Sequence, residues 1–288
     1  MTRGHLRPQT NHPPREAEVV LAMRQATLAF GSRVLWAGLG LDVRVGEFVA
    51  VLGPNGSGKT SLLRTVLGAQ PLTSGDLSFL GQPVRRGHRS IGYIPQQKLA
   101  ERGVPLRAQD LVRLGIDGTR WGLPMPNRSA RRRVADALAA VGASHLAKAP
   151  LGSMSGGEQQ RVRVGQALIG APRLLLCDEP LSSLDLYHQR VVSELLDQSR
   201  RNHPLGVVMI THDINPVLDM VDRVVYLAAG QARVGTVDEV LTTEVLSELY
   251  QTSVEVLRLN GRVVVVGVPE DVQGQLSQGG HHHEDGHR

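Results

Sequence analysis

The sequence has few of the residues that mark secreted, membrane-spanning or base-stacking proteins. It contains one cysteine, Cys177, so an intramolecular disulfide is excluded and a reducing compartment is indicated. Aromatic residues make up only 3%, which argues against a nucleic-acid binder that stacks bases on rings. No stretch approaches the roughly 20 apolar residues of a membrane-spanning helix, and the polar N-terminus lacks a signal-peptide core. We therefore expect a soluble, cytoplasmic protein that binds no nucleic acid.

The residues that are present can form a folded core. Hydrophobic residues make up 41% of the chain, which excludes global disorder, and 288 residues allow one large domain or two modest ones. The net charge of +5 is mild for this length. Its basic clusters at 85–86 and 131–133 are interpreted as solvated faces or phosphate contacts, rather than as a nucleic-acid surface.

A glycine-rich loop between a predicted strand at 48–52 and a predicted helix at 61–67 is the strongest local signal. Its glycines let backbone N–H groups converge on a phosphate, and the helix adds the positive end of its dipole. Lys59 is expected to neutralise the β- and γ-phosphates and Thr60 to bind Mg²⁺, whereas a functionless turn would need neither flanking element. The predicted nucleotide-binding residues are Gly53, Pro54, Asn55, Gly56, Ser57, Gly58, Lys59, Thr60 and Ser61.

Two adjacent carboxylates end a second apolar segment. Residues 173–177 read as a strand buried on both faces, as in a parallel sheet, and Asp178 and Glu179 follow. Acids are costly to desolvate at such a place. A Mg²⁺ ion at Asp178 and a water at Glu179 would explain both acids, which a plain surface turn would not require.

Two more predicted strands end in polar residues. Gln96 follows the strand at 91–95, and His212 lies at the polar end of the apolar strand at 206–211. The carboxyl ends of strands in an open parallel sheet are where catalytic groups collect. We therefore expect these side chains to lie near the phosphate loop.

A further helix is expected to begin at Ser155. Ser155 and Glu158 have the spacing of a capping box, in which each side chain satisfies a backbone N–H of the other residue. Gly156 and Gly157 leave the first turn bare, so a ligand can approach its N–H groups. An ordinary capped helix is the alternative interpretation.

The expected fold class is α/β, with a phosphate-loop NTPase core sheet, an antiparallel β subdomain and an inserted α-helical subdomain. Strands are predicted at 19–30 and 34–45, whereas 98–153 changes to helical spacing. A last hairpin turns at Asn260-Gly261. The expected segments are a disordered leader at 1–18, an ATPase domain at 19–250 containing the helical subdomain, a hairpin extension at 251–270 and a His-rich mobile tail at 271–288.

Taken together in this order, the motifs resemble those of the ATP-binding subunits of ABC transporters, over about residues 19 to 250. The Ser155-Gly156-Gly157-Glu158-Gln159 segment between the two nucleotide motifs is the specific feature, because a phosphate loop alone occurs in many families. Met154 and Cys177 depart from the usual aliphatic residues, and both are apolar enough to pack.

The resemblance implies a role for each matching residue. Asp178 would hold Mg²⁺ and Gln96 would sense it together with the attacking water, while Glu179 would act as the general base. His212 would contact the γ-phosphate and Phe30 would stack on adenine. Ser155, Gly156 and Gly157 would face the ATP of a second subunit, with Asp185 in the loop that couples the two.

The same resemblance implies ATP and Mg²⁺ as cofactors and a head-to-tail homodimer as the active unit. The dimer would lie at the cytoplasmic face of the membrane, held there by separate permease subunits that are served by an extracytoplasmic metal-binding protein. Residues 184–189 and 249–266 look like those of metal or metal-chelate importers. Zinc is expected first and manganese next, because a His-rich tail is a metal-ligand cluster by composition. Its possible zinc ligands are His281, His282, His283 and His287.

Other interpretations of the function and of the carried substrate remain open. The carried substrate could be an iron chelate or cobalamin. A soluble ABC ATPase acting on DNA would carry a long coiled coil between its motifs, and one acting on ribosomes would carry two ATPase units; neither feature is visible in the sequence. A phosphate-loop kinase would lack the Ser-Gly-Gly-Glu helix. The tail is equally well read as a solubilising segment.

Overall fold

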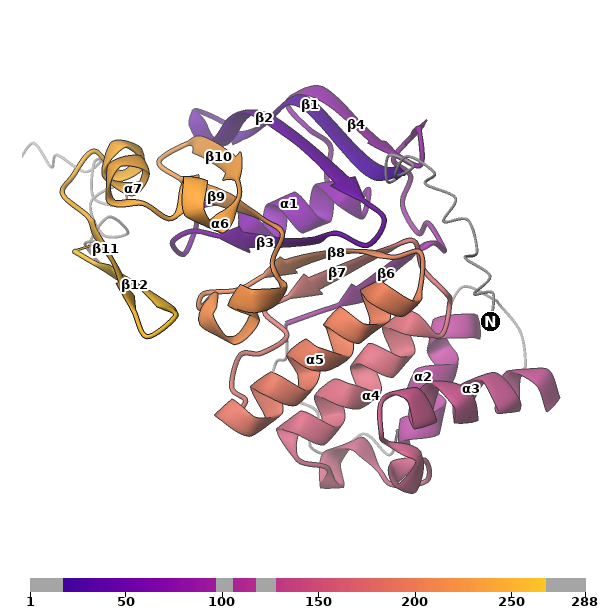
Figure 1. The fold of residues 1–288 in the computed structure, drawn as a ribbon. Coiled ribbons are helices and arrows are strands. Elements are labelled where there is room, and N and C mark those ends of the chain that lie inside the picture. Colours follow the sequence, from indigo (N-terminus) through magenta and orange to yellow (C-terminus); the bar gives the residue numbers. More distant parts are fainter. Residues whose placement is uncertain (1–17, 97–105, 118–127, 268–288) are drawn as a thin grey trace, which may run out of the picture.

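The described chain is layered, with a mostly parallel sheet between a group of helices and an antiparallel sheet (Figure 1). The structure is a computed structural model that describes residues 18–96, 106–117 and 128–267. The expected leader, save its last residue, and the His-rich tail lie outside the described residues. The α/β fold class predicted from the sequence is confirmed.

The central sheet brings five parallel strands together. β9, β3, β8, β7 and β6 run in parallel, and β10 is antiparallel to β9 at one edge. The carboxyl ends of the parallel strands therefore meet along one side of the sheet. In spatial order the strands are β10 (Gln231–Gly235), β9 (Arg223–Ala228), β3 (Phe48–Leu52), β8 (Gly206–Ile210), β7 (Leu174–Asp178) and β6 (Ile91–Ile94).

A second, antiparallel sheet covers one face of this core, with helix α1 (Lys59–Val66) between the two (Figure 1). β2 lies at its edge, as the imperfect alternation of the sequence predicts, and pairs with β1. The strands, in spatial order, are β2 (Arg33–Arg44), β1 (Val19–Phe30), β4 (Ser74–Phe79) and β5 (Gln82–Pro83).

Strand β3 shows why two hydrophobic cores form. All five of its residues are buried, and successive side chains of a strand point to opposite faces. Phe48 and Ala50 belong to the core shared with the helices α4 (Gly156–Leu168) and α5 (Leu186–Asn202), whereas Val49 and Val51 belong to the core around α1. A strand with two buried faces is what the continuous apolar run predicts.

The helices on the other face include the predicted helical region. α2 (Ala108–Asp117) and α3 (Arg128–Ala140) pack with α4, and the stretches 97–105 and 118–127 lie outside the described residues. A Cβ at Gly115 of α2 would lie 2.2 Å from the Gln166 carbonyl oxygen of α4. The two helices therefore approach more closely than any larger residue would allow.

The C-terminal part differs from the sequence prediction in one respect. A single helical stretch is expected at 237–250, but the structure has α6 (Val237–Val240) and α7 (Thr243–Tyr250). The Thr242 side chain accepts a bond from the Val245 N–H and so starts a new helix. The predicted hairpin of β11 (Glu255–Leu259) and β12 (Arg262–Val266) is present, and it turns through positive φ at Asn260 and Gly261.

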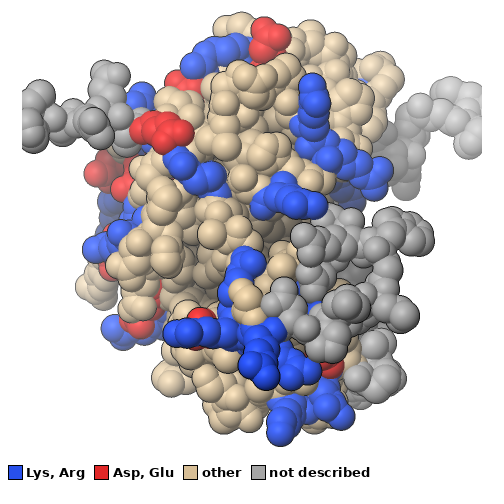
Figure 2. Space-filling view, turned by 90° about the vertical axis from the view of Figure 1, so that its right-hand side faces the viewer, with Lys and Arg blue, Asp and Glu red and all other residues tan. Residues whose placement is uncertain are grey.

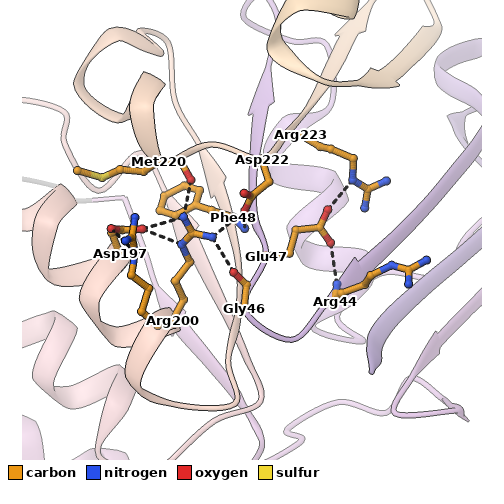
Figure 3. A network of polar contacts seen from close by, with 10 residues as sticks. Arg44, Gly46, Glu47, Phe48, Asp197, Arg200, Met220, Asp222 and Arg223 are labelled. Carbon is orange, nitrogen blue, oxygen red and sulfur yellow. Dashed lines mark hydrogen bonds and ion pairs between the residues drawn. The ribbon is translucent and has the colours of Figure 1, made fainter. Parts of the chain in front are cut away.

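A buried arginine, Arg200, bonds to residues near the amino ends of the central-sheet strands (Figure 3). Arg200 of α5 is 8% exposed. Its guanidinium lies 5.7 Å from the centre of the Phe48 ring. It also donates to two carboxylates and two carbonyls, those of Asp197 at 2.8 Å, Asp222 at 2.7 Å, Gly46 at 2.6 Å and Met220 at 2.8 Å.

Basic side chains lie in several groups on one face of the molecule. Figure 2 shows Lys and Arg in several separate groups over the face at the right of Figure 1, with less Asp and Glu among them. Arg85, Arg86, Arg131 and Arg132 are exposed, as expected for solvated side chains. None of the described helices is long and apolar enough to cross a membrane.

Candidate functional site

The residues singled out from the sequence gather at the carboxyl edge of the central sheet. The phosphate loop follows β3, Glu179 follows β7, Gln96 lies just past β6, and His212 lies just past β8. Because β8 lies between β3 and β7, its polar end is placed between the phosphate loop and the two acids. A cleft of about 440 Å³ opens here, lined in part by Leu52, Pro54, His212 and Tyr226.

The phosphate loop requires glycine at specific positions. Gly53, Gly56 and Gly58 have φ values of 138°, 76° and 95°. A Cβ at Gly53 would lie 2.1 Å from the Leu227 carbonyl oxygen, so only glycine fits there. The Ser57 hydroxyl is buried and has no hydrogen-bond partner among the described residues. A cradle with curled glycines and an unsatisfied hydroxyl is suited to a phosphate group.

Lys59 is held inside this loop. Its side chain is only 6% exposed, and its ammonium donates to the carbonyl oxygens of Gly53 at 2.7 Å and Pro54 at 2.9 Å. Burial lowers the pKa of Lys59, and the negative charges of Glu179 and Asp178 act in the opposite direction. A buried cation that is paired only with neutral carbonyls is suited to an anionic ligand.

Asp178 is placed to share a cation with the loop. The Thr60 hydroxyl donates to its carboxylate at 3.4 Å, and the Tyr93 hydroxyl approaches the other oxygen at 3.5 Å. Burial and the neighbouring Glu179 raise the pKa of Asp178. A hydroxyl and a carboxylate are oxygen ligands of the kind that Mg²⁺ binds together with nucleotide phosphates. No cluster of three or more His, Cys, Asp or Glu side chains forms a metal cage within the described ranges.

Glu179 is clamped between two polar side chains from neighbouring strands. One carboxylate oxygen lies 2.5 Å from His212 Nε2, and the other accepts from Gln96 Nε2 at 2.7 Å. The backbone of Glu179 has a φ of 50°, a conformation that residues other than glycine rarely adopt. Its N–H donates to Ile210 at 3.1 Å and its carbonyl accepts from the Ser182 hydroxyl at 2.8 Å, so β8 and the next turn hold this geometry.

The Ser155 helix begins as the sequence predicts. Ser155 caps α4 and forms a full capping box with Glu158. Ser155 and Gly156 are exposed, whereas Gly157 is buried against the ring of His188. A Cβ on Gly157 would lie 2.0 Å from the ring of His188.

His188 joins the Ser155 helix to the loop that carries Asp185. Its Nδ1 lies 2.9 Å from both carboxylate oxygens of Asp185, and its backbone N–H donates to the same carboxylate at 2.8 Å. Asp185 caps α5, and its side chain is 65% exposed. These hydrogen bonds hold the pKa of Asp185 below its ordinary value. Two surfaces expected to face a second subunit are thus fixed to each other.

Phe30 and Arg33 lie across the turn between β1 and β2. Phe30 is 54% exposed, so its ring is available for stacking. Arg33 donates to the Gly56 carbonyl at 3.1 Å and so contacts the phosphate loop. No motif marks Arg33 or Tyr93 in the sequence, and His188 is marked only as part of the segment 184–189, without a role of its own. The folded chain brings all three to the site. The four tail histidines, His281, His282, His283 and His287, lie outside the described residues.

The chain is similar in sequence to proteins of known family. The family profile described as ABC transporter matches residues 37–182. The zinc import ATP-binding protein ZnuC of Magnetococcus marinus is 32% identical over 226 residues, which cover 78% of this chain and 80% of that protein. The protein of the same name from Yersinia pestis is 34% identical over 209 residues, covering 73% and 76%.

Solved structures give the same result. A structure described as an inward-facing conformation of a metal-chelate type ABC transporter aligns with a TM-score of 0.72 at 25% identity, covering 86% of this chain and 96% of that one. CbiO1 of Clostridium perfringens, described as part of the ABC transporter complex CbiONQ, aligns with a TM-score of 0.68 at 25% identity, covering 80% and 93%. The chain therefore belongs to the ABC transporter family, as one of its ATP-hydrolysing subunits.

Proposed function

We propose that this subunit powers the import of a metal ion, zinc first and manganese next, through a separate membrane permease. The names of the curated relatives, which are ATP-binding proteins of zinc import, support this assignment. One observation supports the proposal that the subunit hydrolyses ATP at this site. Glu179 lies between Gln96 and His212, at the edge of the sheet that also holds the phosphate loop.

In this mechanism, ATP enters with its adenine on Phe30 and its phosphates in the glycine cradle. Lys59 then turns from its own loop carbonyls to the β- and γ-phosphates. Thr60 and Asp178 would hold Mg²⁺, which neutralises charge on the phosphates when bound. Glu179 accepts the proton of the attacking water.

Gln96 and His212 have a positioning role in the same step. Each holds one oxygen of Glu179 in the described geometry, so together they fix the direction in which the carboxylate accepts a proton. With ATP bound, His212 would also contact the γ-phosphate, and Gln96 would also orient the attacking water and help to hold Mg²⁺. Orientation of this kind accounts for much of the catalysis in phosphoryl transfer, because little covalent chemistry is left to the protein.

The active unit is proposed to be a head-to-tail homodimer with two shared ATP sites. Ser155 and Gly156 are exposed at a helix N-terminus, where N–H groups and the dipole favour a phosphate. The Ser155→Arg variant is expected to load ATP as the wild type does but to hydrolyse none, because the added bulk obstructs closure against the partner. If its monomer lost nucleotide affinity as fully as Lys59→Ala, the shared-site arrangement would be wrong.

The region at about 98–153 is proposed to dock the permease and so hold the subunit at the cytoplasmic face of the membrane. An extracytoplasmic metal-binding protein would deliver the cargo from the other side. Val112 is buried, so cysteines placed at the exposed positions Arg107 and Asp110 of this region are expected to cross-link to a permease loop. Failure at both positions, in a complex that still hydrolyses ATP, would place the docking surface elsewhere.

The cargo is tested by growth of a strain that lacks this gene. In medium depleted of metals, added zinc is expected to restore growth without the gene, and wild-type protein is expected to restore it at low zinc, whereas Lys59→Ala is not. Restoration by manganese alone would change the metal. The likeness to a metal-chelate type transporter supports a second cargo class, iron chelates or cobalamin, and restoration by these alone would select it.

The His-rich tail is proposed to bind Zn²⁺ weakly through His281, His282, His283 and His287. The composition of the tail predicts a mobile segment, and ordering such a segment on binding costs entropy, so its affinity should be well below that of a preformed site. Calorimetric titration compares the full chain with one ending at Gly280. Equal zinc binding by both would place the metal elsewhere, and loss of ATP hydrolysis on truncation would make the tail part of the ATPase.

A further inference from the structure

The loop that carries His212 is fastened to the C-terminal hairpin by one side chain. The Asn215 amide donates to the Val263 carbonyl at 3.0 Å, and its oxygen accepts from the Val263 N–H at 2.9 Å. The side chain of Asn215 thus binds the edge of β12 as a neighbouring strand would. We name this pair of bonds between Asn215 and Val263 the clasp.

The clasp reaches back to His212 through Asp213. One carboxylate oxygen of Asp213 accepts from the Asn215 backbone N–H at 2.9 Å and from its side-chain amide at 2.7 Å. The Asp213 carbonyl in turn accepts from the Thr211 hydroxyl at 2.6 Å. With these bonds both amide hydrogens and the amide oxygen of Asn215 are used, so its orientation is fixed.

The clasp uses a free edge of the hairpin. Both polar backbone groups of Val263 go to Asn215, so they point away from β11. Backbone groups alternate in direction along an antiparallel strand, so those of Val265 also point away. The partner of Val265 on β11 is Val256, whose N–H donates to the Thr243 hydroxyl at 3.0 Å rather than across the hairpin.

The hairpin is held on its other side by the C-terminal helices. Arg258 pairs with Asp238 of α6 at 2.7 Å, and the Thr243 bond ties β11 to α7. Val263 is 6% exposed, whereas Leu259 and Val266 are 57% and 46% exposed. The hairpin therefore has limited contact with the rest of the molecule. The clasp connects it to the carboxyl edge of the central sheet, where the catalytic residues lie.

We propose that Asn215 is a positioning residue for ATP hydrolysis, through which the β11–β12 hairpin sets the approach of His212 to Glu179 and the γ-phosphate. The inference rests on the proposed role of His212. The His212 side chain is 47% exposed and bonds to Glu179, so the loop behind it determines where the imidazole lies. A displacement of about 1 Å at a reacting group can cost up to ~100-fold in rate.

Four single variants of the full chain and one double variant test the proposal by their ATPase kinetics. Asn215→Ala removes the clasp. Val263→Pro removes the N–H donor of the clasp at a position where no bond across the hairpin is lost, and it also replaces a buried valine side chain. Both are expected to lower kcat about 10-fold and to change the KM for ATP less than about twofold, since the phosphate loop is untouched. Val265→Pro places a proline at the next outward-facing position of the same strand, and it should lower kcat less than Val263→Pro does.

The fourth variant, His212→Ala, separates the two proposals. The double variant with Asn215→Ala should be no slower than His212→Ala alone, because Asn215 acts through His212. Wild-type turnover by His212→Ala would overturn both the role of His212 and the clasp. Loss of turnover in His212→Ala, with a normal kcat in Asn215→Ala or with losses that multiply in the double variant, would overturn the clasp alone. Thermal unfolding of each variant shows that the compared proteins are folded.

Discussion

The two ends of the central sheet each bury a cation, and the two cations have different partners. Arg200 at the amino ends is 8% exposed and bonds to the carboxylates of Asp197 and Asp222 (Figure 3). Lys59 at the carboxyl ends is 6% exposed and bonds to neutral carbonyls of its own loop. No carboxylate of the described residues pairs with it. The charge of Arg200 is compensated within the fold, whereas a buried cation paired only with carbonyls is suited to an anionic ligand.

The largest effect is expected at the carboxyl ends. Glu179→Gln should lower kcat by about 10²- to 10⁴-fold, because the amide cannot accept the proton of the water. It should leave ATP binding and the free energy of unfolding near wild type. Steady-state ATPase assays and urea unfolding measure these quantities, and size exclusion with ATP should show a trapped dimer. Wild-type turnover by this variant would contradict the assignment of Glu179.

The amino ends should show the opposite pattern. Arg200→Met leaves the half-exposed Asp222 without its cation and the Gly46 and Met220 carbonyls without their donor, whereas Asp197 keeps Arg201. The free energy of unfolding should therefore fall by about 1–3 kcal/mol. The kcat per folded molecule should stay near wild type. Arg190→Ala is the matched control on the same helix, because Arg190 is an exposed arginine paired with Glu194; urea unfolding should show no measurable change. Equal effects of the two variants would remove the contrast between the ends.

A third effect concerns crowding at the Ser155 helix. Gly157→Ala places a methyl group within 2.0 Å of the His188 ring, and overpacking of this kind costs about 1–3 kcal/mol. In Gly156→Ala the new methyl meets Leu184 at 3.5 Å, an ordinary contact, so stability should be kept. Thermal unfolding compares the two. Adding His188→Ala to Gly157→Ala should restore stability; if it does not, the strain lies in the backbone and not in the ring.

Many elements of the fold can be predicted from local patterns in the sequence. The apolar run of β3, the capping box of Ser155 with Glu158 and the Asn260-Gly261 turn each depend on neighbouring residues, and each appears as predicted. The break between α6 and α7 was missed because Thr242 lies within an otherwise helical spacing. A threonine cap is a weak signal when apolar residues continue on both sides.

The contacts that distinguish the two ends could not be read in the same way. Besides Asp197 on its own helix, Arg200 bonds to two separate segments of the chain, at Gly46 and at 220–222. Asn215 meets Val263 across 48 positions. Sequence motifs predict Lys59, Asp178 and Glu179 as residues of the site. Whether a buried charge is paired depends on the packed structure, and no local spacing encodes that.

The smallest expected effect concerns the charge of Asp178. Burial and Glu179 raise the pKa of Asp178, so the folded protein binds this proton more tightly than the unfolded chain does. The stabilising contribution is full below the ordinary pKa of an aspartate and is lost as pH rises through the raised one. At neutral pH without ligand, Asp178→Asn should therefore unfold at a temperature higher by about 2–4 °C for each ~1 kcal/mol gained.

The same variant should lose Mg²⁺-dependent hydrolysis, because the amide is a poorer ligand for the ion. Melting curves of both proteins across acid to neutral pH, in chelator and without nucleotide, make the comparison. Their difference should be smallest at low pH, where the wild-type carboxyl is also uncharged, and should grow towards neutrality. A variant less stable than wild type at neutral pH would mean that the Asp178 carboxylate is as well compensated as the acids around Arg200. In that case the carboxyl ends hold their charges for the fold and not for a ligand.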